Sequence, residues 1–79
     1  MPELTVADKI AALLTPYLGP FNSKIAIKTF AKKALNLEPE EIEVTHVPKL
    51  LEALRPMLHT LIGRESTNAL IKQIQRGVG

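Results

Sequence analysis

The hydrophobic residues of the first segment recur at the spacing of an amphipathic helix. They lie mostly three or four positions apart, which places them largely on one helical face: Leu4, Ile10, Leu13, Leu14, Tyr17 and Leu18. Thr5 and Asp8 have the spacing of a capping box at the start of this helix. Pro16 disfavours a helical conformation for Thr15, so the pattern predicts that the helix ends or bends near Leu14.

A second apolar stripe predicts a second helix that begins around Pro20 and runs to about Leu35. Proline suits the first turn of a helix, and Asn22 or Ser23 can cap the free backbone N–H groups there. The stripe that we expect to be buried contains Ile27, Phe30, Ala31, Ala34 and Leu35. Residues 36–44 then form a connection that holds at most one helical turn.

The longest apolar series in the chain begins after Thr45, which has the position of an N-cap. The series keeps helical spacing through Val47, Leu50, Leu51, Leu54, Met57, Leu58, Leu61 and Ile62. Pro56 lies inside this pattern and removes one backbone hydrogen bond, which predicts a kink or a break there. Gly63 is expected to close the helix.

The last predicted helix spans about Glu65 to Arg76, with Ser66 or Thr67 as its cap and Gly77 as its stop. Its apolar stripe contains Leu70, Ile71 and Ile74. We find no internal repeat. Together the patterns predict an all-α fold: one compact domain over residues 1–79, built as a bundle of about four helices and kinked or broken at Pro56.

The small size of the chain favours association with a partner. A domain of 79 residues buries only about 60–65% of the surface of its unfolded chain. The sequence is 46% hydrophobic and contains no cysteine, so neither disulfides nor thiolate metal sites can stabilise it. A protein partner, or a second copy of the chain in a homodimer, could cover the remaining apolar surface.

The composition also indicates the compartment. Absence of cysteine is compatible with a reducing environment, so we expect a cytoplasmic location. No apolar run approaches the roughly 20 residues of a membrane span. The first residues carry Glu3 and Asp8, where a secretory signal would be basic. We therefore expect neither a targeting segment nor a membrane partner.

Charge is unevenly distributed, although the formal net charge is only +2. Residues 1–37 carry five lysines against two acids, residues 38–54 five glutamates against one lysine, and residues 55–79 four bases against one acid. The simplest interpretation of this uneven distribution is a set of solvent-exposed helix faces that carry charges of different sign. The alternative is a nucleic-acid-binding protein that uses Lys24, Lys28 and Lys32, which recur every fourth residue on one helical face.

The residues for catalysis and tight metal binding are missing from the sequence pattern. No motif joins a serine or threonine to the two imidazoles, His46 and His59. These histidines are too far apart to ligate a metal from adjacent turns, and the acidic stretch around Glu40 lacks the ligand pattern of a calcium loop. The glycines form no phosphate-binding cluster. We therefore expect no enzymatic activity, no cofactor and no metal site.

The remaining hypothesis is a protein-interaction or dimerisation module. The candidate contact residues are large apolar side chains that a small bundle cannot easily bury, namely Tyr17, Phe21, Met57 and Ile62. We expect Lys24, Lys28 and Lys32 to form a charged rim around them.

The chain also resembles a known class of helical modules. The residues that carry the resemblance are Tyr17-Leu18-Gly19-Pro20, the stretch Leu35 to Ile42, the helix start Thr45-His46-Val47-Pro48, the leucine series to Leu61, and Gly63. This pattern is similar to small all-helical accessory modules attached to bacterial signalling proteins such as kinases and response regulators. The resemblance implies a domain that docks proteins or dimerises, for example as an adaptor in bacterial signalling.

Overall fold

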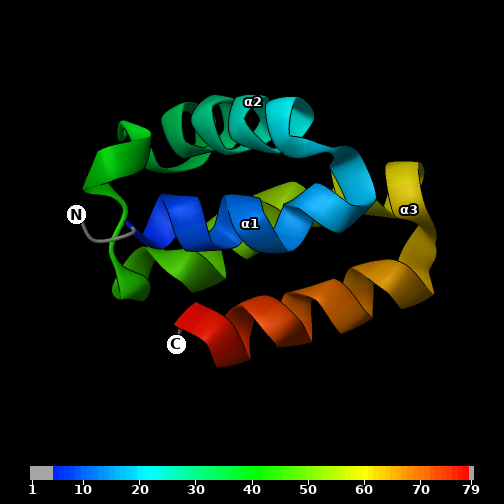
Figure 1. Ribbon diagram of the computed structural model, residues 1–79. Coiled ribbons are helices and arrows are strands. Elements are labelled where there is room, and N and C mark those ends of the chain that lie inside the picture. Colours follow the sequence, from blue (N-terminus) through cyan, green and yellow to red (C-terminus); the bar gives the residue numbers. More distant parts are fainter. Residues whose placement is uncertain (1–4, 79) are drawn as a thin grey trace.

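Helices and short helical turns account for nearly all of the computed structural model, which describes residues 5–78 (Figure 1). Along the chain these are the α-helix α1 (Val6–Leu18), the α-helix α2 (Pro20–Phe30), the π-turn η1 (Ala31–Leu35), the 3₁₀ turns η2 (Pro39–Glu41) and η3 (Val44–His46), and the α-helix α3 (Val47–Val78). Residues 5–78 contain no strand, and the all-α class is confirmed.

The first helix begins as predicted but extends further. The hydroxyl of Thr5 accepts a hydrogen bond from the amide of Asp8 at 3.0 Å, and the Asp8 carboxylate accepts one from the amide of Thr5 at 3.2 Å. Helix α1 then continues through Pro16 to Leu18, so of the end or bend predicted near Leu14 the end is wrong. Pro16 lies on the exposed side of the helix, where water can satisfy the carbonyl that loses its partner.

The start of α2 is capped differently from the prediction. Helix α2 begins at Pro20 with Gly19 as its N-cap, and no side chain caps it. The Ser23 hydroxyl donates to the Gly19 carbonyl at 2.6 Å, and Nδ2 of Asn22 donates to the Leu18 carbonyl at 3.2 Å. Both side chains therefore bond to carbonyls of the preceding turn and do not satisfy the free N–H groups.

The end of the second helix agrees with its predicted boundary. The helical run continues beyond α2 through the π-turn to Leu35 and stops at Asn36, which adopts a left-handed conformation with φ 55°. Asparagine tolerates this conformation better than most residues. The connection contains one 3₁₀ turn that starts at Pro39 and a second that leads into α3. Ile42 between the two turns is buried in the core.

The second half of the chain forms one long helical element. Helix α3 turns a corner at Gly63, where φ is 83° and ψ is 165°. We call residues 47–62 its first arm and residues 64–78 its second arm. The structure thus has three α-helices and not about four, because both predicted C-terminal helices belong to α3.

Of the kink or break predicted at Pro56, the break is wrong, because α3 continues through this residue. Gly63 is the one position of α3 with non-helical dihedral angles. Pro56 is exposed, so water can reach the carbonyl whose hydrogen bond the proline removes. Thr45 lies inside the 3₁₀ turn before α3 and does not cap the helix. The hydroxyl of Thr67, a predicted cap, donates to the Gly63 carbonyl at 2.7 Å from inside the second arm.

The corners at Gly19 and Gly63 are two copies of the same structure. Gly19 has φ 86° and ψ 159°, close to the values at Gly63, and each glycine carbonyl accepts a hydrogen bond from a fully buried hydroxyl in the next turn. The residues around the first corner recur around the second with the same spacing. The matching pairs are Asp8 and Glu52, Ile10 and Leu54, Leu14 and Leu58, Gly19 and Gly63, Ser23 and Thr67, and Ile27 and Ile71. The chain therefore contains an internal repeat that the sequence analysis missed.

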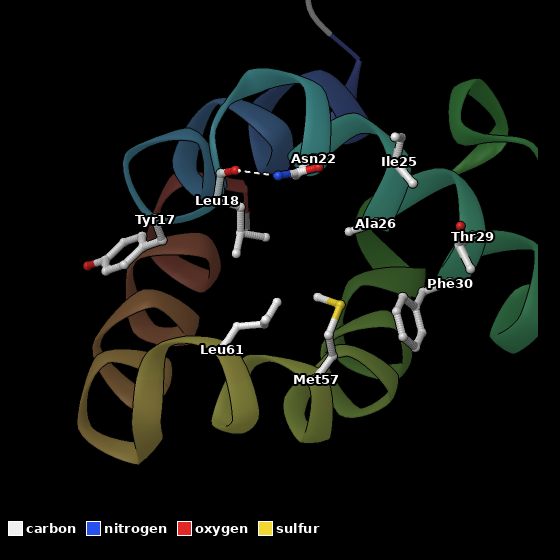
Figure 2. Close-up of a pocket in the computed structure, with 9 residues that line it drawn as sticks. All are labelled: Tyr17, Leu18, Asn22, Ile25, Ala26, Thr29, Phe30, Met57 and Leu61. Carbon is white, nitrogen blue, oxygen red and sulfur yellow. Dashed lines mark hydrogen bonds between the residues drawn. The ribbon is translucent and has the colours of Figure 1, made fainter.

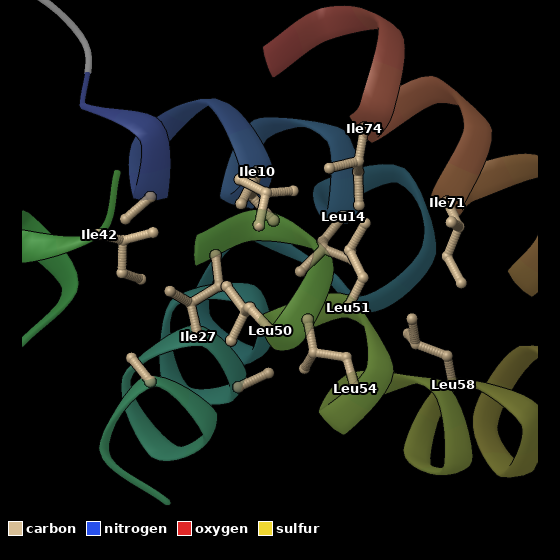
Figure 3. Close-up of a cluster of buried hydrophobic side chains, with 14 of the residues drawn as sticks. Ile10, Leu14, Ile27, Ile42, Leu50, Leu51, Leu54, Leu58, Ile71 and Ile74 are labelled. Carbon is tan, nitrogen blue, oxygen red and sulfur yellow. The ribbon is translucent and has the colours of Figure 1, made fainter. Parts of the chain in front are cut away.

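The core lies where α1 meets α2 and both arms of α3. Figure 1 shows α1 between α2 and the second arm of α3, with the first arm behind it. The largest fully buried hydrophobic side chains are all aliphatic: Ile10, Leu14, Ile27, Leu50, Leu51, Leu54, Leu58, Leu70 and Ile74. Figure 3 labels all of these except Leu70. The stripes predicted for the first arm and the last helix thus supply most of the interior. Leu4 of the first predicted stripe lies outside the described residues.

Candidate functional site

An apolar pocket opens between α2, the end of α1 and the first arm of α3 (Figure 2). Its volume is about 570 Å³. We call it the α2–α3 pocket, and its lining residues are Tyr17, Leu18, Asn22, Ile25, Ala26, Thr29, Phe30, Met57 and Leu61. Figure 2 shows Met57 and Leu61 pointing from α3 toward the facing helices. No charged residue lines this pocket.

Exposed apolar side chains gather at the same place. Among residues 5–78, the exposed large hydrophobic residues are Tyr17, Phe21, Ile25, Val44 and Leu61. All of them except Val44 line the pocket or lie one helical turn from a lining residue. Phe21 is 74% exposed and precedes Ile25 by one turn of α2. The pocket and Phe21 thus form one apolar surface, of the kind that marks binding sites.

By the internal repeat, the contact between α1 and the second arm of α3 is the counterpart of the α2–α3 pocket. There the second arm of α3 lies against α1, and a β-carbon on Gly77 would be only 3.3 Å from Cδ1 of Leu13. By the spacing of the repeat, Met57 corresponds to Leu13, and Lys33 corresponds to Gly77. Glycine leaves room for the facing helix, whereas a lysine side chain at the equivalent position occupies more space. The α2–α3 side contains the open pocket.

The structure brings together two of the four apolar residues predicted for contact. Tyr17 and Met57 line the α2–α3 pocket, and Phe21 is exposed beside it. Ile62 does not line the pocket, because it is half-buried and packs against the core.

The predicted lysine rim lies elsewhere on α2. Lys24 and Lys28 line a second cavity of about 310 Å³, together with Asp8, Ala7, Ala11, Ile27 and Pro39. Lys32 is exposed on the π-turn and lines neither cavity. These lysines therefore do not form a rim of the α2–α3 pocket, and Asp8 contributes negative charge beside two of them.

Sequence reasoning missed seven of the nine residues that line the pocket, including its two exposed aliphatic side chains, Leu61 and Ile25. Leu61 belongs to the apolar stripe that we expected to be buried, yet it is 59% exposed. Ile25 is 46% exposed and lies off the predicted stripe of its helix. An isoleucine outside the buried face of an amphipathic helix was the one sequence feature that could have drawn attention to this surface.

The two histidines have different surroundings. Nδ1 of His46 accepts a hydrogen bond from the amide of Glu43 at 3.0 Å. Nε2 of His59 and Nε of Arg55, one helical turn away, are buried and have no hydrogen-bond partner within residues 5–78. Over the same range, no three metal-ligating side chains gather into a group that could hold a metal ion.

Comparison of the chain with protein-family models, with curated proteins and with solved structures finds no match. Within the described part of the chain, no helix has the length and apolar character needed to cross a membrane. The α2–α3 pocket is therefore interpreted from its own residues.

Proposed function

We propose that this chain is a non-enzymatic protein-interaction module whose α2–α3 pocket receives apolar side chains of a partner helix, from another protein or from a second copy of the chain. The observation that carries this proposal is the concentration of exposed apolar side chains at an open apolar pocket. A domain of this size lacks the interior to bury them, and a partner would remove them from water.

The shape and polarity of the pocket favour a helix over a polar small molecule. Asn22, Ile25, Ala26 and Thr29 line it from successive turns of α2, over a length of about 10 Å. Met57 and Leu61 face them from one side of α3. A partner helix anchors in such a groove through apolar residues at the same spacing. Recognition of a polar ligand needs several converging polar groups, and here the Nδ2 group of Asn22 already donates to Leu18.

The same proposal extends to the biological setting. The resemblance to helical modules of bacterial signalling proteins supports a role as an adaptor or dimerisation unit in signalling. In that setting the pocket would dock the chain onto a helix of a kinase, a response regulator or a similar protein.

The test is a titration with a helical peptide followed by NMR amide spectra of the labelled protein. The probe is an amphipathic peptide of about 16 residues, about 24 Å long as a helix, with leucines on one face and glutamines on the other. We expect shifts at Ile25, Thr29, Phe30, Met57 and Leu61. Leu61→Ser should weaken binding about tenfold, because it removes an apolar contact worth about 1.4 kcal/mol.

Val44→Ser is the matched control, because Val44 is 49% exposed but lies outside the pocket. This variant should bind the peptide like the original protein. The proposal fails if the shifts map elsewhere, or if Leu61→Ser binds as tightly as Val44→Ser while circular dichroism shows both variants folded.

A further inference from the structure

We propose that the α2–α3 pocket receives one leucine side chain from a helix of another protein, and that this side chain packs against Ala26. This inference rests on the proposed function and names the residue that anchors the partner. Its basis is a difference between the two copies of the internal repeat, namely the size of the side chains that face the neighbouring helix.

In the second copy of the repeat, a leucine lies on the helical face that packs against α1. Leu70 and Gly77 are seven residues apart in the second arm of α3, so they share one helical face. A β-carbon on Gly77 would be 3.3 Å from Cδ1 of Leu13, which places this face against α1. Leu70 is fully buried, whereas its neighbour Ala69 is exposed. The second arm thus has its larger apolar side chain inside and its smaller one outside.

Helix α2 has the reverse arrangement at the equivalent positions. Ala26 lies seven residues after the first corner glycine, as Leu70 lies seven residues after the second. Ala26 is therefore the counterpart of Leu70, and Ile25 is the counterpart of Ala69. Ala26 is buried and Ile25 is 46% exposed, and both line the α2–α3 pocket. The pocket therefore lacks the large aliphatic side chain that Leu70 supplies in the other copy of the repeat.

The side chains around Ala26 suit a leucine from a partner. Figure 2 shows the pocket between Ala26 on α2 and Met57 on α3, with Phe30 beside them. All three are apolar, and the flexible thioether of a methionine adapts to the shape of an incoming side chain. Leucine is the side chain that occupies the equivalent place in this fold, and it also favours the helical conformation expected of the partner.

A second copy of the chain is a poorer source of this leucine. Among residues 5–78, Leu61 is the one exposed leucine, and it lines the same pocket. To enter the pocket of another copy, it would have to leave the wall of its own. Val44, the exposed aliphatic residue outside the pocket, lies in a 3₁₀ turn and not in an α-helix. We therefore assign the leucine to a different protein.

The first experiment changes the leucines of the leucine peptide to alanine, one at a time, and measures the binding of each peptide to the unaltered protein. One central leucine should dominate. Its replacement should weaken binding about tenfold, and replacement of any other leucine about threefold or less. An intermolecular nuclear Overhauser effect between the methyl group of Ala26 and the methyl groups of the dominant leucine should show the contact directly.

The second experiment fills the pocket from the protein. In Ala26→Leu the new side chain takes the place proposed for the leucine of the partner, so the leucine peptide should bind about tenfold more weakly. The peptide with alanine at the dominant position should bind this variant more tightly than the leucine peptide does, which reverses the order found for the unaltered protein. Ala69→Leu is the matched control. It makes the same change at an exposed position outside the pocket and should keep the original order.

The outcomes separate this inference from the proposed function. Equal losses for all leucines, or unchanged binding by a folded Ala26→Leu, would overturn the leucine anchor and leave the proposed function intact if the peptide still shifts the pocket residues. If no peptide shifts them, both proposals fail. A mass above 8.7 kDa in concentration-dependent sedimentation, with the dimer contact mapped to the pocket, would replace the other protein by a second copy. If circular dichroism shows Ala26→Leu unfolded, the peptide series on the unaltered protein decides.

Discussion

A side chain at Gly63 would meet no neighbouring atom within 4 Å, yet this glycine is needed for its backbone conformation. With φ 83° and ψ 165° it occupies a region that residues with a β-carbon strongly avoid. Gly19 adopts nearly the same angles at the other corner. At the residue scale, these two glycines determine where the chain turns, whereas Pro16 and Pro56 are accommodated inside helices.

The first prediction concerns this backbone requirement. Gly63→Ala should lower the free energy of unfolding by about 1–3 kcal/mol, because alanine must adopt a strained conformation or force the corner to rearrange. Urea unfolding followed by circular dichroism measures the effect. Gln73→Ala, at an exposed position of the same arm, should change stability by no more than about 0.5 kcal/mol. Equal stability of the two variants would contradict the role assigned to Gly63.

At the scale of elements, the apolar stripe of the first arm of α3 serves two purposes. Leu58 is fully buried against the core, whereas Leu61, three residues later, is 59% exposed and lines the pocket. Both leucines fit the same helical pattern, and the pattern alone does not separate them. Their difference depends on which helices pack against each side of the arm.

The second prediction separates these two leucines. Leu58→Ala should cost about 2–5 kcal/mol of unfolding free energy, because it leaves a cavity in the core. Leu61→Ala should cost well under about 1 kcal/mol, because little of its contact area is lost. Thermal unfolding of the two variants supplies the comparison. A loss for Leu61→Ala as large as that for Leu58→Ala would show that the pocket is closed in solution.

At the scale of the whole molecule, the distribution of charge argues against nucleic acid as the partner. The formal net charge is only +2. Lys24 and Lys28 stand beside Asp8, and no charged residue lines the α2–α3 pocket. Affinity for the nucleic-acid backbone depends on several lysines or arginines that contact phosphates together.

The third prediction tests this alternative directly. Random duplex DNA should show no measurable binding to the chain, even at low salt, in a fluorescence anisotropy titration. A steep loss of affinity with added salt, together with weaker binding of the variant Lys24→Gln, Lys28→Gln, Lys32→Gln, would instead support the nucleic-acid hypothesis.

The amino-acid sequence by itself determined the helical class, most of the helix boundaries and nearly all of the core. The capping box at Thr5, the end of the second helix at Leu35 and the buried stripe Leu70, Ile71 and Ile74 were all predicted correctly. These features depend on local propensity and on the period of one helix, and both are encoded in neighbouring residues.

The sequence predicted that a helix closes at Gly63, and only the tertiary structure decided the backbone angles of the corners, the internal repeat and the pocket. Whether Pro56 breaks a helix depends on whether water reaches the freed carbonyl, and whether Leu61 is buried depends on how far α2 lies from α3. Three of the six residue pairs of the repeat are identical and three are only similar, and the matching backbone angles at Gly19 and Gly63 revealed it. The burial of Leu61 and the opening of the pocket depend on segments far apart in the chain, and a hydrophobic period does not specify the distance between them.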